Sequence, residues 1–262
     1  MSDADGGGGW PPEAVDYVQS VADTKLLLSH RYAEWMLSGP ALEDDIAGAS
    51  AAQDELGHVR QLFRLLDQQG RDDDWLEGDR SPVEFANAAP LDTNPESWVE
   101  FVVTLGLVER AAWYLVDAID HADFDGLGTR IGQDEFFHLE FLDGRLETLA
   151  DERPEEVRTA MEASLPGVLA FLGPAAYDDD TDPLVATGFT DRSAAVLRSS
   201  FRDRYDEVLG GTGLSLAAFE VDWDAPSLEA WDATRRRVGD GTIGETDVER
   251  LSGVRNAEFA MD

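Results

Sequence analysis

Two of the four histidines in this 262-residue chain lie in the same short pattern, Glu55-x-x-His58 and Glu135-x-x-His138. On an α-helix, residues three positions apart project from one face, so each pattern presents a carboxylate and an imidazole together. Both groups are common metal ligands, and together they suit iron. Two such units on separate helices are typical of a carboxylate-bridged dinuclear metal site inside a four-helix bundle.

A site of this kind also needs one carboxylate from each of two further helices. If each pair of helices forms a hairpin, the missing ligands lie at mirrored depths across the turns. This symmetry selects Glu34 opposite Glu55 and Glu109 opposite Glu135, both within mainly apolar helical stretches. A buried carboxylate without a partner is costly, so a metal would explain these positions. The predicted metal ligands are Glu34, Glu55, His58, Glu109, Glu135 and His138, and no separate catalytic residue is assigned.

Each Glu-x-x-His unit taken alone has an alternative interpretation as a surface ion pair. The chain holds 55 acidic residues, so carboxylates occur near any histidine by composition. Asp54 and Asp134 precede the two glutamates and point about 100° away from the ligand face. We expect them to support the site or to be solvated.

The hydrophobic periodicity predicts an all-α fold, with helices that can build the required bundle. Four helices are expected at residues 11–37, 42–69, 94–120 and 127–149. Short turns join the first pair and the second pair, and a long crossover joins helices 2 and 3, which is the ferritin-like connectivity. Further helices are expected at 154–172, 191–209 and 245–261. The predicted organisation is a flexible leader (1–10), a ferritin-like four-helix bundle (11–150) and a C-terminal helical extension that packs on it (151–262).

The composition restricts the function classes. A net charge of −35 would repel nucleic acids and anionic membranes, and we interpret it as adaptation to concentrated salt. There is no cysteine, which excludes disulfides and thiolate-bound metals. No apolar run has the length of a membrane span, and the first residues do not form a secretory signal. A cytoplasmic location is therefore expected.

Several segments resemble the PaaA/PaaC family, the subunits of phenylacetyl-CoA epoxidase. The resemblance is carried by Ala33-Glu-Trp35, by Leu-Glu-Asp-Asp-Ile-Ala at 42–47, and by the Gln-Asp-Glu-x-x-His units at 53–58 and 133–138. Overall length and the connection between helices 2 and 3 are closer to the PaaC branch. In that family many PaaC members have lost ligands and serve as structural partners, whereas all six candidate ligands are present in this chain.

The resemblance implies a subunit of a multicomponent monooxygenase with a di-iron site, in which manganese is an alternative. It implies O2 as co-substrate, a reductase component as electron source, a CoA thioester as substrate and a PaaA-like subunit as partner in a hetero-oligomer. Two other functions stay open. The chain is a non-catalytic structural partner of a PaaA-like catalytic subunit, or it is a ferritin-like iron-binding protein or ferroxidase.

Overall fold

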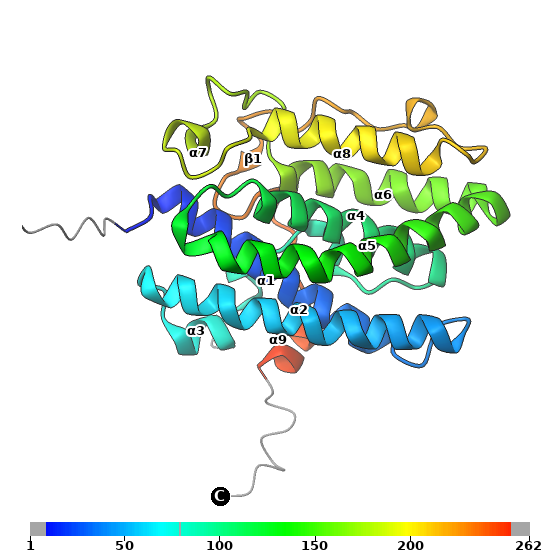
Figure 1. The fold of residues 1–262 in the computed structure, drawn as a ribbon, viewed down its shortest axis with the longest axis horizontal. Coiled ribbons are helices and arrows are strands. Elements are labelled where there is room, and N and C mark those ends of the chain that lie inside the picture. The colour runs from blue at the N-terminus through cyan, green and yellow to red at the C-terminus, as the bar shows by residue number, and fades with distance from the viewer. Residues whose placement is uncertain (1–8, 79, 253–262) are drawn as a thin grey trace, which may run out of the picture.

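The computed structural model describes residues 9–78 and 80–252, and this part of the chain is almost entirely helical (Figure 1). The helices are α1 (Pro12–Trp35), α2 (Leu42–Gln68), α3 (Asp73–Glu77), α4 (Trp98–Asp117), α5 (Asp125–Glu152), α6 (Pro154–Leu172), α7 (Pro183–Ala186), α8 (Ala194–Leu209) and α9 (Glu245–Leu251). Short 3₁₀ turns occur at Pro82–Glu84 (η1), Ala89–Asp92 (η2), Ala122–Phe124 (η3) and Leu216–Ala218 (η4). Strands β1 (Trp231–Asp232) and β2 (Arg237–Val238) form a small antiparallel pair. The predicted all-α class is confirmed.

Four long helices form the bundle. α1 pairs with α2 and α4 pairs with α5, and the connection that carries α3, η1 and η2 crosses between the two hairpins. This single long crossover is the ferritin-like connectivity that the sequence predicts. Figure 1 shows α1, α2, α4 and α5 lying roughly side by side, with α6 and α8 above them.

The start of α4 differs from the expected one. The Asn94-Pro95 pair does not begin the helix; instead Ser97 is the N-cap, and its Oγ accepts a hydrogen bond from the Glu100 N–H at 3.2 Å. A serine oxygen in this place satisfies an N–H group that the first helical turn leaves unpaired.

The turn between α1 and α2 begins about two residues earlier than expected, whereas α2 begins at the expected residue. α1 ends at Trp35, and Leu37 then adopts a left-handed backbone conformation with φ of 68°. α2 begins at Leu42, and Asp44 in its first turn accepts a hydrogen bond from the Ala41 N–H at 3.0 Å. The centre of the turn therefore falls between Ser38 and Gly39, which changes the depth at which residues of α1 meet α2.

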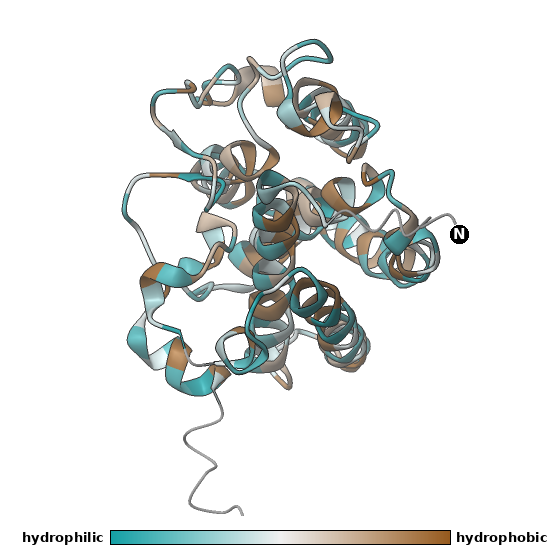
Figure 2. Ribbon diagram, turned by 90° about the vertical axis from the view of Figure 1, so that its left-hand side faces the viewer, coloured by the Kyte–Doolittle hydropathy of each residue, from teal (hydrophilic) through white to brown (hydrophobic). Residues whose placement is uncertain are grey.

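α4 is the central helix of the fold, and its side chains are buried on nearly every side. α6 packs along it, and Gly167 of α6 allows close contact with η2, because a Cβ at Gly167 would lie 2.8 Å from Pro90 Cδ. Figure 2, turned by 90°, shows hydrophobic residues on the sides of the helices that face one another.

The region after the bundle is attached to it by a buried ion-pair network. Asp143 of α5 lies 2.6 Å from Arg110 of α4 and 2.6 Å from Arg204 of α8. Most of the predicted leader, residues 1–8, lies outside the described residues. Trp10 is buried and packs against Phe124, so the end of the predicted leader belongs to the folded body.

The last predicted helix is shorter than expected within the described part of the chain, where α9 reaches Leu251. The remainder of that prediction, from residue 253, lies outside the described residues. None of the helices that the structure describes is long and apolar enough to cross a membrane.

Candidate metal centre

Five predicted ligands meet in the middle of the bundle, and we call them the acid–histidine cluster: Glu55, His58, Glu109, Glu135 and His138. Glu55 and His58 come from α2, Glu109 from α4, and Glu135 and His138 from α5; all five are buried. One donor atom from each of Glu55, Glu109, Glu135 and His138 lies within 4.8 Å of the others. The cluster can therefore hold a metal ion.

The two histidines are positioned reciprocally by the two sequence motifs. His58 Nε2 lies 3.1 Å from Asp134 Oδ2, and His138 Nε2 lies 3.4 Å from Asp54 Oδ2. Each imidazole thus pairs with the aspartate that precedes the glutamate of the other motif. These two reciprocal contacts link α2 to α5 and direct the Nδ1 atoms of both histidines toward the glutamates of the cluster. Aspartates behind ligating imidazoles are a common means of orienting the rings in metal sites.

Glu109 is held from two sides. The Tyr32 hydroxyl donates to Glu109 Oε2, and His138 Nδ1 lies 2.8 Å from Oε1. Hairpin symmetry identifies Glu109 in the sequence but gives no indication of Tyr32. Tyr32 comes from α1 and is buried, so its hydroxyl needs a buried acceptor.

The contribution of α1 to the cluster is an ammonium group. Lys25 is the only lysine of the chain, and its Nζ donates to Glu55 at 2.9 Å and 3.1 Å and to Glu135 at 2.5 Å. The side chain is fully buried. Sequence reasoning missed Lys25 because a helical lysine usually indicates a solvent-exposed position. Its uniqueness in an apolar stretch was the available signal.

The charges in the cluster shift the pKa values of its members. Burial acts to lower the pKa of Lys25, but Glu135 and Glu55 outweigh it and raise that pKa. Burial acts to raise the pKa of Glu55, but the Lys25 ammonium lowers it below its usual range. Burial raises the pKa of Glu135, and the Lys25 ammonium acts to lower it. The nearby Glu55 and Glu109 act in the same direction as burial, so the pKa stays well above its usual value. Lys25 is therefore charged, and the negative charge that balances it lies mainly on Glu55, not on Glu135.

His138 is also a cationic group in this arrangement. Burial acts to lower its pKa, but the hydrogen bond to Glu109 and the charge of that carboxylate raise the pKa to about 10. The metal-free cluster is therefore neutralised from within, by an ammonium and an imidazolium.

Glu34 does not join the cluster, and the prediction that it is the ligand from α1 is corrected. Its carboxylate pairs with Arg31 at 2.9 Å and with Arg250, near the C-terminal end of α1. The centre of the turn lies about six residues before the midpoint of Glu34 and Glu55, so the part of α1 beside Glu55 is about three turns before Glu34. Lys25 lies nine positions before Glu34, about two and a half turns, and therefore on the opposite side of the helix.

The donor set fits a metal in part. Two buried atoms, His58 Nδ1 and Glu135 Oε2, have no hydrogen-bond partner, as expected for groups that can ligate a cation. However, a dinuclear site in such bundles uses four carboxylates and two imidazoles. The cluster supplies three carboxylates, and the place of the fourth is taken by Lys25. The residues therefore fit one cation better than two.

A hollow beside the cluster reaches one of its members, His138. It has a volume of about 250 Å³ and lies between α2 and α5, with Tyr32, Asp54, Asp134, Phe137 and His138 among its lining residues. Of the five cluster residues, only His138 lines this hollow.

The fold and site together define a ferritin-like helical protein with a buried acid–histidine cluster that can hold a metal ion. The family model of the phenylacetic acid catabolic proteins, PaaA/PaaC, matches residues 10–257, and the chain belongs to this family. Membership supports a role in phenylacetate catabolism. A search of curated proteins finds no match.

Proposed function

We propose that the chain is a subunit of a multicomponent oxygenase of the phenylacetyl-CoA epoxidase type, close to the PaaC branch. Within that complex it is the structural partner of a catalytic PaaA-like chain. The observation that supports this role is the position of Lys25. Its ammonium bridges Glu55 and Glu135 at the place where a bundle with a dinuclear site holds its metal ions.

The electrostatic argument rests on what a buried carboxylate pair requires. Glu55 and Glu135 lie in the interior, where an uncompensated carboxylate charge would destabilise the fold. A metal ion is one way to compensate it, and Lys25 is another. An ammonium 2.9 Å from Glu55 and 2.5 Å from Glu135 opposes the binding of a divalent cation there, since like charges repel strongly in a low-dielectric interior.

A second candidate is an oxygenase chain that holds metal itself, supported by the two unpartnered donor atoms. Glu55, Glu109, Glu135, His58 and His138 would then be the ligands. Bound iron would supply the capacity to bind and reduce O2. The chain's own residues would hold the site: Asp54 and Asp134 orient the imidazoles, Tyr32 donates to Glu109, and the Lys25 ammonium holds Glu55 and Glu135.

Metal analysis separates these candidates. We expect wild-type protein, produced aerobically with added iron, to contain well under two iron ions per chain. Two ions per chain in the wild type, lost in Glu55→Ala, would reject the structural role in favour of the metal-holding one.

Turnover provides the second test. Phenylacetyl-CoA should be converted when this chain, a PaaA-like chain and a reductase are combined, and Glu135→Gln in this chain should leave the rate largely unchanged. Conversion that needs Glu135 would show that this chain is the catalyst. No conversion with any combination would contradict the proposed substrate.

A further inference from the structure

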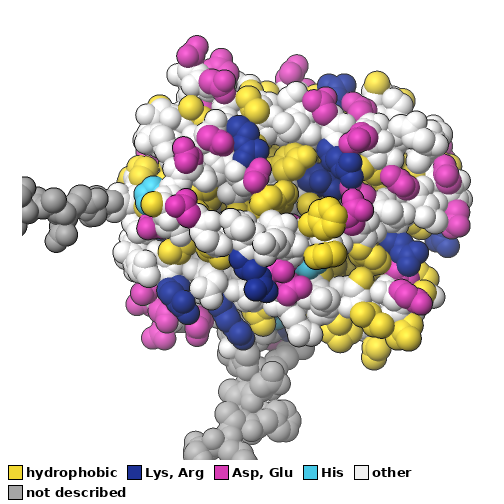
Figure 3. Space-filling view, in the orientation of Figure 1, with side chains coloured by type: hydrophobic (Ala, Val, Ile, Leu, Met, Phe, Trp, Pro, Cys, Tyr) yellow, Lys and Arg dark blue, Asp and Glu magenta, His cyan; other side chains and the backbone are white. Residues whose placement is uncertain are grey.

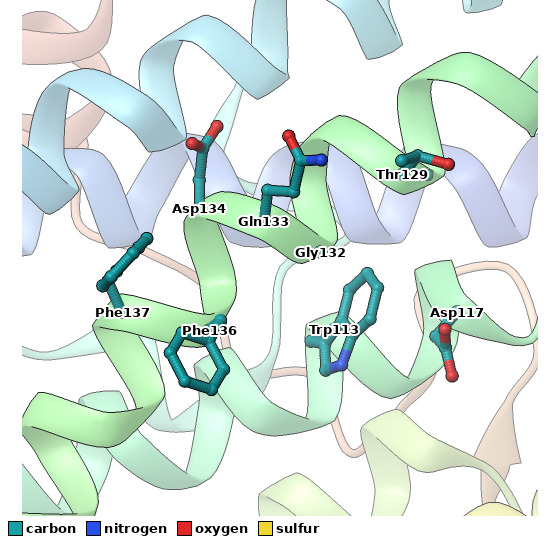
Figure 4. A pocket seen from close by; sticks show the side chains of 9 residues that line it. Trp113, Asp117, Thr129, Gly132, Gln133, Asp134, Phe136 and Phe137 are labelled. Carbon is teal, nitrogen blue, oxygen red and sulfur yellow. The ribbon is translucent and has the colours of Figure 1, made fainter.

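Two adjacent phenylalanines of α5 are exposed beside an open hollow. Phe136 is 60% exposed and Phe137 is 70% exposed, and their rings meet edge to face at 5.3 Å between centroids. The hollow has a volume of about 800 Å³ and includes Trp113 of α4 in its lining. Figure 4 shows the rings leaving α5 in different directions, with Trp113 beside Phe136.

The floor of this hollow is shaped by a glycine. A Cβ at Gly132 would lie 2.6 Å from Trp113 Cη2, so a larger residue would displace the indole. The indole therefore lies against the backbone of α5, where it is only partly buried, and it continues the apolar surface of the two phenylalanines. Clusters of exposed aromatic side chains of this kind mark protein-interaction sites.

The same side of the molecule carries arginines that lack acidic partners. Arg60 and Arg64 stand one turn apart on α2, are exposed, and have no carboxylate within 4 Å in the described part of the chain. Arg64 donates only to Gln61. The other exposed arginines that the structure describes, Arg130, Arg153 and Arg250, each have such a partner.

The absence of acids around these arginines is local. Residues 56–66 of α2 and 126–133 of α5 contain no acidic residue, although the chain has 55 acids among its 262 residues. α2 and α5 run antiparallel and are joined through His58 and Asp134, so these two stretches lie beside each other. Figure 3 shows hydrophobic side chains near the centre of this view, with both basic and acidic side chains around them.

We infer that this surface, the α2–α5 face, is a docking site for a second helical protein whose contact surface carries carboxylates around an apolar ridge. The α2–α5 face is defined by Arg60, Arg64, Trp113, Arg130, Phe136 and Phe137. Aromatic and arginine side chains are the residue types that dominate binding energy at protein interfaces. The unmatched arginines specify an acidic partner, because charge complementarity governs which surfaces associate.

An acidic partner would be repelled by most of this chain, whose net charge is −35. The two acids that line the hollow of the α2–α5 face, Asp117 and Asp134, are paired with Arg192 and Arg130. The face is apolar at its centre, so it repels such a partner less than the rest of the surface does. Identification of the partner as the catalytic PaaA-like subunit rests on the proposed function, whereas the location of the face rests on the residues named above.

Binding of the purified chain to the PaaA-like chain of the same organism tests the inference, with dissociation constants from sedimentation velocity. We expect Phe136→Ser with Phe137→Ser to raise Kd at least tenfold. Leu37→Ser is the matched control, because Leu37 is 83% exposed on another part of the surface and should leave Kd unchanged. Circular dichroism of each variant confirms that the helical fold is retained.

The charge contribution is tested with Arg60→Glu combined with Arg64→Glu. This variant should raise Kd more at about 0.5 M salt than at about 2 M, since salt screens exposed charges. Arg153→Glu, at the N-cap of α6, with Arg158→Glu, inside α6, makes the same change of net charge and should have a much smaller effect.

The outcomes distinguish the two proposals. Wild-type binding with unchanged Kd in both α2–α5 variants would overturn the inference and leave the proposed function intact. No wild-type binding at all would overturn both. If the wild-type chain forms a homodimer and the phenylalanine variant is monomeric, the α2–α5 face mediates self-association, and this result also overturns the inference.

Discussion

Lys25 and Glu135 are 110 positions apart in the chain, and the Lys25 Nζ lies 2.5 Å from Glu135 Oε1 in the centre of the bundle. The same ammonium donates to Glu55, so one side chain of α1 joins the glutamates of both Glu-x-x-His motifs. This contact replaces the carboxylate that a dinuclear site would take from the first helix. It therefore bears on both the stability and the metal content of the protein.

Removal of the Lys25 ammonium should destabilise the metal-free protein. Lys25→Met leaves Glu55 and Glu135 buried without their counter-charge, and the loss of one partner of a buried ion pair costs about 3–5 kcal/mol. The measurement is the free energy of unfolding in denaturant. In the double variant with Lys25→Met and Glu135→Gln, part of the lost stability should be recovered. Changes in unfolding free energy that simply add would contradict a coupling between the two residues.

Replacement of Lys25 by a carboxylate should create a better metal site. Lys25→Glu supplies a fourth carboxylate from α1, and the metal content after exposure to Fe²⁺ or Mn²⁺ should rise above that of the wild type. Elemental analysis after dialysis gives the stoichiometry, and the added ion should also raise the midpoint of thermal unfolding. Equal metal content in wild type and variant would show that Lys25 does not limit binding.

Glu34 and Glu109 were predicted as equivalent ligands, and their substitution should now have unequal effects. Glu109→Leu leaves the Tyr32 hydroxyl and His138 Nδ1 without their acceptor, which should cost about 3 kcal/mol of stability. Glu34→Gln removes partly exposed ion pairs and should cost within about 1 kcal/mol. Loss of metal from the Glu34 variant, with stability unchanged, would restore Glu34 to the ligand set.

These differences show where sequence reasoning succeeds. The Glu-x-x-His spacing determines local geometry, because three positions on a helix always share a face, and both motifs lie where they were expected. Glu109 was found because the turn after α4 was placed well. Glu34 was misplaced because the midpoint of Glu34 and Glu55 lies inside α2 and not in the turn after α1, and hairpin symmetry converts this error into an error in depth.

The remaining features depend on contacts between distant segments. Lys25 is buried only because two glutamates from other helices surround its ammonium, and no local pattern around Lys25 encodes them. Likewise, the pairing of His58 with Asp134 needs the register between α2 and α5, which neither helix specifies alone.

The histidine at position 30 should make stability sensitive to mild acid. Burial lowers the pKa of His30 below its usual value, and the opposing effect of Glu34 does not cancel this. The unfolded chain then binds a proton more readily than the folded one, so stability decreases as pH falls below about 6.5. His30→Gln should remove this contribution. As the pH falls from about 7 to about 5, the unfolding free energy of the wild type should therefore decrease more than that of the variant. A constant difference over that range would contradict the prediction.

The large negative charge should make the fold dependent on salt. At about 1 M salt the Debye length is about 3 Å and the repulsion among exposed carboxylates is screened, whereas at about 50 mM it acts over more than 10 Å. We therefore expect the helical circular dichroism signal to fall on dialysis into about 50 mM sodium chloride. Sucrose of equal osmolarity, which does not screen charge, should not prevent the loss. An unchanged spectrum at low salt would show that the packing of the bundle alone outweighs the repulsion of a net charge of −35.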